Sequence, residues 1–239
     1  MDTLRLNRPE VRMVAHRGLS GIELENTASA FVAAGNRSYY GIETDVHRTA
    51  DGQFVVIHDD DTLRVSGDRL AVEDTSYETL RALRLKDTDG RRGRADLRIP
   101  SLAEYSAICK KYNKVSVLEL KNAFSREDIA RIVEIVGEVG WLEKTTFISF
   151  NLDNLLFLRE MLPNQSAQFL TGEFSPELLD TLKRHRLDLD IHYRALTRKA
   201  ARALKDAGIL VNVWTVDDLE EARRMADYGV DFITSNIIE

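Results

Sequence analysis

Short apolar runs alternate with amphipathic helical segments along most of this chain. The pattern predicts a strand at 145–150, a helix at 152–161 and another strand at 167–170, with only short connections between them. Strands that are joined through helices by short connections run parallel to one another. The pattern therefore indicates an α/β fold built on a parallel sheet.

The ends of the predicted helices carry recognisable sequence signals. Ser125 and Asp128 form a capping box, Asp217 and Glu220 are the expected capping pair of a later helix, and Gly229 ends that helix. These signals delimit the helices independently of the apolar periodicity.

The number of predicted parallel strands selects one architecture. Strands are expected to begin near residues 11, 42, 115, 145, 167, 187, 209 and 230. That count of eight closes a (β/α)8 TIM-type barrel. The alternative, an open doubly wound sheet, often carries a Gly-rich phosphate loop, which this sequence lacks. We expect a single barrel domain over residues 1–239.

One region departs from the repeat. Segments 42–46 and 54–58 predict a hairpin with its turn at Asp51-Gly52, and the largely polar stretch 59–98 follows. Long excursions between barrel elements are often functional. We interpret 59–98 as a small insertion after strand 2 on the active-site face, acting as a lid. A solvated loop without substrate contact is an equal alternative.

Composition narrows the range of partners. Thirty-three basic and 39 acidic residues give a net charge of −6, which argues against a nucleic-acid partner. No stretch has the length needed for stable membrane insertion, and residues 1–12 lack the apolar run of a signal peptide. With Cys109 as the single cysteine, we expect a cytoplasmic protein. The periodicity leaves a homodimer open.

Charged and titratable side chains gather at the predicted strand ends, where barrels place their catalytic groups. Glu43 and Asp45 are two residues apart and so project from one face, as do Glu119 and Lys121. The full set is His16, Arg17, Glu43, Asp45, His58, Glu119 and Lys121.

Three inward carboxylates at a barrel mouth are costly unless a cation neutralises them. A set of oxygen ligands from Glu43, Asp45 and Glu119 favours a hard ion, Mg²⁺ or Ca²⁺, over zinc. An ordinary pair of Glu119 with Lys121, or a structural network of ion pairs, is the simpler alternative.

The remaining groups fit phosphate chemistry. Arg17 and Lys121 are suited to a phosphate that also contacts the cation, and His16 and His58 can exchange protons near neutral pH. His47 shares the parity of Asp45, but we expect it to be exposed to solvent.

The motifs together resemble those of the glycerophosphodiester phosphodiesterase family over nearly the whole chain. They are His16-Arg17-Gly18, Glu25-Asn26-Thr27, Glu43-x-Asp45-Val46, Thr49-x-Asp51-Gly52, Val56-x-His58-Asp59, Ile99-Pro100-Ser101-Leu102, Leu118-Glu119-Leu120-Lys121, Trp214-Thr215-Val216 and Gly229-Val230-Asp231-x-Ile233-Thr234. Two positions depart from the family pattern: Leu24 replaces a common proline, and Ser235 replaces a common aspartate. The second departure leaves the rim opposite the metal unassigned.

The resemblance implies an α/β barrel with a small insertion after strand 2 and one divalent cation. It assigns metal ligation to Glu43, Asp45 and Glu119, acid-base catalysis to His16 and His58, phosphate binding to Arg17 and Lys121, pocket lining to Trp214, and support to Glu25 and Asn26.

The reaction expected from the resemblance is metal-dependent hydrolysis of a small-molecule glycerophosphodiester to glycerol-3-phosphate and an alcohol. We favour His16 as the base and His58 as the acid, with either water or the neighbouring glycerol hydroxyl as the nucleophile. Two alternatives are a lysophospholipase D-like phosphodiesterase acting on lysophospholipids and a non-catalytic barrel that binds phosphoryl ligands.

Overall fold

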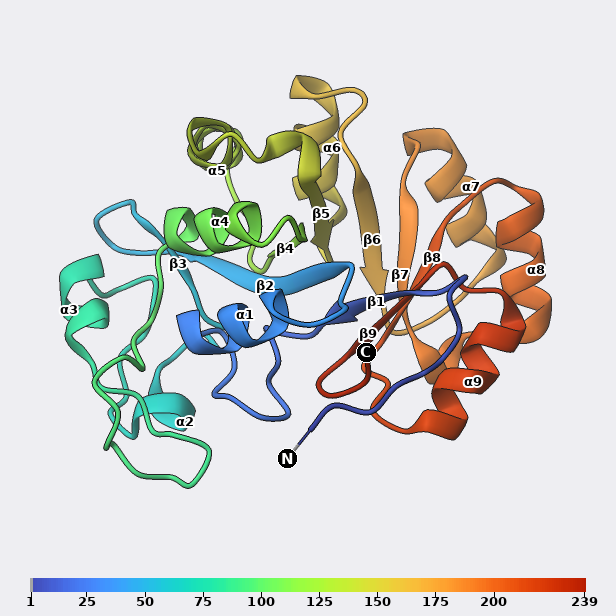
Figure 1. Cartoon of the computed structure of the whole chain (residues 1–239). Coiled ribbons are helices and arrows are strands. Elements are labelled where there is room, and N and C mark those ends of the chain that lie inside the picture. The colour runs from blue at the N-terminus through green and yellow to red at the C-terminus, as the bar shows by residue number, and fades with distance from the viewer. Residues whose placement is uncertain (1) are drawn as a thin grey trace.

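The computed structural model describes residues 2–239 of the chain. Within them, eight parallel strands form a closed ring, because β1 pairs with both β2 and β9. The predicted barrel is therefore confirmed (Figure 1). Its strands are β1 (Arg12–Ala15), β2 (Gly41–Arg48), β4 (Val115–Leu120), β5 (Thr145–Ser149), β6 (Ala167–Thr171), β7 (Asp188–His192), β8 (Val211–Trp214) and β9 (Phe232–Ser235).

Helices surround the barrel on its outside (Figure 1). They are α1 (Ala28–Gly35), α4 (Leu102–Lys111), α5 (Arg126–Val139), α6 (Leu152–Met161), α7 (Pro176–His185), α8 (Arg198–Asp206) and α9 (Leu219–Tyr228), with the short 3₁₀ turns η1 (Leu142–Lys144) and η2 (Tyr193–Ala195). Across the part of the chain that the structure describes, no helix is both long and apolar enough to cross a bilayer.

Of the two helix-start caps predicted above, one is confirmed and one is wrong. Ser125 and Asp128 form the expected capping box of α5. The expected cap of α9 at Asp217 is wrong, because the Asp218 carboxylate accepts the free backbone N–H groups of Glu220 and Glu221. Asp217 is thereby left to bind the segment after β9.

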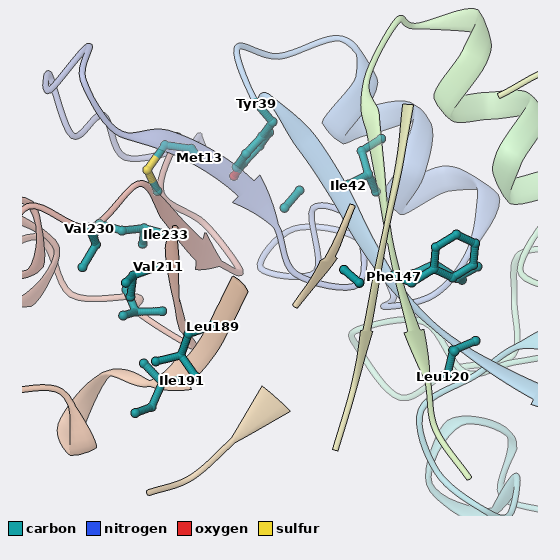
Figure 2. Close-up of a cluster of buried hydrophobic side chains, with 14 of the residues drawn as sticks. Met13, Tyr39, Ile42, Leu120, Phe147, Leu189, Ile191, Val211, Val230 and Ile233 are labelled. Carbon is teal, nitrogen blue, oxygen red and sulfur yellow. The ribbon is translucent and has the colours of Figure 1, made fainter. Parts of the chain in front are cut away.

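Two apolar clusters support the barrel. The larger one lies between strands and helices, and Figure 2 shows part of it, including Phe147, Leu189 and Ile233. The smaller one fills the inside of the barrel and comprises Val14, Val117, Ile148, Leu170 and Phe232. Side chains alternate across each strand, so positions further along the inward face are free to carry polar groups.

The excursion after strand 2 begins with the predicted hairpin. β3 (Phe54–Val56) pairs antiparallel with β2. Two short helices follow, α2 (Leu63–Ser66) and α3 (Tyr77–Ala82), on one side of the barrel (Figure 1). This region has an apolar cluster of its own, made by Val55, Ile57, Val65, Val72, Leu80, Leu85, Leu97 and Ile99. Its function as a lid stays a prediction.

Candidate active site

The strand ends line a cavity of about 100 Å³ at the mouth of the barrel. Lining residues follow directly after β1, β3, β4, β5 and β8, and others lie within β2, β6, β7 and β9. Its lining comprises His16, Arg17, Glu43, His58, Glu119, Lys121, Ile148, Phe150, Leu170, Asp190, Trp214, Thr215 and Thr234. Residues 59–98 contribute none of these side chains.

Three predicted carboxylates come together beside this cavity. Glu43, Asp45 and Glu119 are all buried, and their ligand oxygens lie within 4.8 Å of one another. The strand register explains the arrangement, since Asp45 on β2 lies directly opposite Glu119 on β4. Asn26 fixes Asp45 in place by donating a hydrogen bond of 2.8 Å to its Oδ2 atom.

Burial and mutual repulsion of the three carboxylates favour the binding of a cation between them. Burial, followed by the charges of its two neighbours, raises the pKa of Glu43 well above its usual value. Burial and the charge of Asp45 raise the pKa of Glu119 to about 7. Burial acts on Asp45 in the same direction, but positive neighbours, Arg17 foremost, hold its pKa below the usual value. A buried, all-oxygen cluster with this repulsion fits a hard divalent ion.

Arg17 is held at the site by both its backbone and its side chain. Its φ of 54° lies in the left-handed region, which few residues other than glycine adopt. In this conformation its backbone N–H donates to Glu43 Oε2 at 2.8 Å, and its guanidinium donates to Glu25 Oε1 at 2.8 Å. Glu25 also accepts two bonds from Arg64, of 2.8 and 2.9 Å. Arg17 is thus oriented by Glu25 from outside the cavity.

Lys121 is a second positive charge, after Arg17, that lies close to the carboxylates. Its Nζ atom is 3.2 Å from Glu119 Oε1 and 3.7 Å from Asp45 Oδ1. The simpler interpretation of Glu119 and Lys121 as an isolated ion pair is therefore insufficient, because the ammonium also faces Asp45 in a largely buried site.

His16 is oriented by a residue from the far end of the chain. The amide nitrogen of Asn236 donates to Asp217 Oδ2 at 2.6 Å, so the amide oxygen faces the His16 ring. His16 Nδ1 therefore carries a proton and donates it to Asn236 Oδ1 at 2.7 Å. Burial, together with the charge of Arg17, lowers the pKa of His16. The neutral ring keeps Nε2 free to accept a proton.

His58 has a charged partner instead. Its Nδ1 atom lies 2.7 Å from Asp59 Oδ1. Asp59 is held by two bonds from Arg64, of 2.7 and 3.0 Å, and these bonds are the main reason that its pKa falls to about 2. The two histidines therefore differ in their partners: a neutral amide for His16 and an anion for His58.

The departure at Ser235 also has a structural account. Ser235 Oγ donates to Asp217 Oδ1 at 2.9 Å, and the next residue, Asn236, contacts the same carboxylate. The rim opposite the carboxylates is thus a network of Asp217, Ser235 and Asn236 that supports His16. No motif in the sequence predicts this network.

Sequence reasoning also missed Arg64 and Asp190 and misplaced His47. Arg64 lies in a segment without a strand-end signal, whereas Asp190 could have been found from its inward parity on β7. Burial, then the charge of Glu119, raises the pKa of Asp190 well above its usual value. His47 is buried rather than exposed, because the His58 carbonyl and Asn122 lie 3.3 Å from its ring nitrogens.

Comparison with known proteins assigns this arrangement to a family. Residues 16–239 match the glycerophosphoryl diester phosphodiesterase family. The chain belongs to this family. A glycerophosphodiester phosphodiesterase of Caldanaerobacter subterraneus is 28% identical over 230 residues, which cover 94% of this chain and 93% of that relative.

Solved structures of similar proteins share the barrel. An Oleispira antarctica phosphodiesterase in complex with the product sn-glycerol-3-phosphate is 25% identical, with a TM-score of 0.88 over 97% of this chain and 95% of that one. A glycerophosphodiester phosphodiesterase from Parabacteroides distasonis is 31% identical, with a TM-score of 0.79 over 95% of this chain and 93% of that one.

Proposed function

We propose that this phosphodiesterase hydrolyses glycerophosphodiesters to glycerol-3-phosphate and an alcohol, with one divalent cation, Mg²⁺ or Ca²⁺. The observation that carries the proposal is a cavity lined by Glu43, Glu119, two histidines, Arg17 and Lys121, with the ligand oxygen of Asp45 within 4.8 Å of those of the two glutamates. The Oleispira antarctica phosphodiesterase with sn-glycerol-3-phosphate supports the choice of substrate class.

Glu43, Asp45 and Glu119 are the proposed ligands of the cation. A divalent ion held there would draw negative charge from the phosphate oxygens as that charge builds up during displacement. Arg17 and Lys121 flank the same cluster, so they bind and orient the phosphate from two sides. Asn26 and Glu25 act as positioning residues, since each bonds a residue at the cavity.

The partners of the two histidines support a division of roles. His16 is neutral, with Nε2 free, so it removes a proton from the nucleophile, which is either water or the neighbouring glycerol hydroxyl. His58 lies beside the anion Asp59, which complements the positive charge that a general acid carries before it gives up its proton. His58 accordingly protonates the oxygen of the departing alcohol.

The decisive experiment measures release of glycerol-3-phosphate from glycerophosphocholine with Mg²⁺, Ca²⁺ or a chelator. Glu119→Gln, which removes one ligand charge at almost constant volume, is the matched variant. We expect release that depends on the cation and is strongly reduced in the variant.

Other substrates separate this proposal from its alternatives. Faster hydrolysis of lysophosphatidylcholine would contradict it in favour of a lysophospholipase D-like activity. Tight binding of glycerol-3-phosphate without turnover of any phosphodiester would favour the non-catalytic barrel.

A further inference from the structure

Four buried polar atoms in the lining of the cavity lack hydrogen-bond partners within the described chain, and two of them, Arg17 Nε and Glu119 Oε1, belong to the charged groups described above. The other two are the acceptor Asp190 Oδ1 and the donor Trp214 Nε1. Asp190 is only 2% exposed, and it projects from β7 into the polar part of the barrel interior. Neither atom has a role in the proton transfers or the charge neutralisation proposed above.

Unpaired buried polar atoms at a binding site fit a ligand that completes their hydrogen bonds. A hydroxyl group both donates and accepts, so a hydroxyl bound in this cavity complements both the acceptor Asp190 Oδ1 and the donor Trp214 Nε1. A carboxyl oxygen accepts a hydrogen bond whether or not the carboxyl group carries a proton. The match therefore does not depend on the ionisation state of Asp190.

The position of Asp190 indicates which part of the substrate it meets. The carboxylates that lie within 4.8 Å of one another are Glu43, Asp45 and Glu119, and Asp190 is not among them. Asp190 thus lies outside the group that would hold the cation, and we assign it to a part of the substrate other than the phosphate. Phe150, which lines the same cavity, is 47% exposed and lies toward solvent. The invariant glycerol group fits the buried side, and the variable alcohol fits the open side.

We propose that Asp190 and Trp214 bind the terminal hydroxyl of the glycerol group and thereby make the enzyme selective for glycerophosphodiesters. This inference rests on the proposed function. The terminal hydroxyl is the glycerol hydroxyl farther from phosphorus, in keeping with the place of Asp190 outside the cation-binding group. Asp190 acts here as a specificity residue.

The test compares kcat/KM for glycerophosphocholine with kcat/KM for its analogue that lacks the terminal glycerol hydroxyl. We expect the wild type to prefer the natural substrate by about 10- to 100-fold, the value of one hydrogen bond to a charged or strongly polar group. Asp190→Leu should bring this ratio close to one. Asp190→Asn should keep part of it, because the amide oxygen still accepts a hydrogen bond.

A matched control comes from one layer deeper in the barrel. Gln168 is buried and its Oε1 atom has no partner in the described chain, yet it does not line the cavity. Gln168→Leu should therefore keep the preference of the wild type. Circular dichroism of all three variants checks that they fold.

A binding measurement separates failure of this inference from failure of the proposed function. Calorimetric titration with Mg²⁺ compares glycerol-3-phosphate with propane-1,2-diol 1-phosphate, which lacks the terminal hydroxyl, and it requires no turnover. The wild type could hydrolyse no glycerophosphodiester and still bind glycerol-3-phosphate more tightly than the analogue, with this preference lost in Asp190→Leu. That result would overturn the proposed function but not the role of Asp190.

Three results would overturn the inference itself. The first is equal treatment of substrate and analogue by the wild type in both assays. The second is an unchanged preference in Asp190→Leu. The third is a loss in Asp190→Leu that is confined to glycerophosphocholine and spares glycerophosphoethanolamine and glycerophosphoglycerol, because that pattern would place the alcohol rather than the glycerol at Asp190.

Discussion

The two halves of the barrel mouth are built from different kinds of side chain. One half comprises β1, β2, β4 and the residues that follow them, and it carries charges, including Arg17, Glu43 and Lys121. β5, β6, β7 and β8 present Phe150, Leu170 and Trp214 instead, with Asp190 on β7 as an ionisable group among them. We call them the charged half and the aromatic half. An apolar wall lowers the local dielectric constant and so strengthens the field of the charges opposite it.

The halves also differ in how they are held. In the charged half, hydrogen bonds fix several of the groups, for example from Asn26 to Asp45 and from the Arg17 backbone to Glu43. In the aromatic half, the Trp214 ring packs edge-on against Phe150, with ring centroids 5.7 Å apart. Directional contacts tolerate less change than ring packing, so substitutions in the charged half should cost more activity.

The largest effect is expected for His16→Ala. Loss of the base should lower kcat by about 10²- to 10⁴-fold, the usual contribution of a positioned proton acceptor. Steady-state hydrolysis of glycerophosphocholine at saturating cation measures it. His192→Ala is the control from the aromatic half, since His192 packs 5.2 Å from Trp214 and is not part of the cavity lining. Equal losses of kcat in the two variants would contradict the expectation that substitutions in the charged half cost more activity.

A smaller effect is expected for Asn26→Ala. This substitution removes the hydrogen bond to Asp45 but leaves all three carboxylates in place. Residues that orient metal ligands typically contribute about 10- to 100-fold in metal affinity. Calorimetric titration with Mg²⁺ or Ca²⁺ should show this loss, and high cation concentration should restore most of the activity. Unchanged affinity for the cation would show that the hydrogen bond from Asn26 to Asp45 does not contribute to cation binding.

The pH dependence of thermal stability tests whether the pKa of Glu119 is raised in the fold. Its pKa of about 7 in the fold exceeds the ordinary value of 4.5, so its protonated form stabilises the fold at low pH. That contribution is lost as pH rises from about 4.5 through 7. Without cation, the Tm of Glu119→Gln should therefore rise relative to wild type, by a few degrees, between pH 5 and pH 8.

Comparison of the two proteins at each pH removes the opposite effect of His16. Burial lowers the pKa of that residue, so its contribution is lost as pH falls. Adding Mg²⁺ should raise the wild-type Tm more at pH 8 than at pH 5, since the ligands must be deprotonated. A Tm difference that does not change with pH would count against the carboxylate cluster.

The smallest effect is expected for Phe150→Ala in the aromatic half. The side chain is 47% exposed and contributes packing rather than charge. We expect less than about tenfold loss in kcat/KM, mainly through KM, because an exposed ring adds little beyond its buried area. A loss as large as that of His16→Ala would show that the aromatic half takes part in the chemistry.

The barrel and the charged half were largely predictable from the sequence. Strand ends such as Glu43-x-Asp45 and Glu119-x-Lys121 follow from alternation along single strands, which is local information. The aromatic half was harder to predict, because Phe150 and Asp190 are single residues at inward positions without a motif. Their role depends on which side chains face them across the barrel.

The supporting contacts could not be predicted for a different physical reason. Arg64 bonds both Glu25 and Asp59, and Asn236 bonds His16 across 220 positions of sequence. Such pairs depend on how loops pack in the tertiary structure, and this packing produces no periodic pattern in the sequence. The same limit explains His47, whose burial comes from Asn122 and the chain at His58.

The bond between His16 and Asn236 bears on how the protein is made in the cell. His16 is translated 220 residues before Asn236, the residue that orients its ring. β9 must also insert between β1 and β8 before the ring of strands closes. A nascent chain on the ribosome therefore has no assembled site, and activity begins only after synthesis has passed residue 236 and the C-terminal strand has docked.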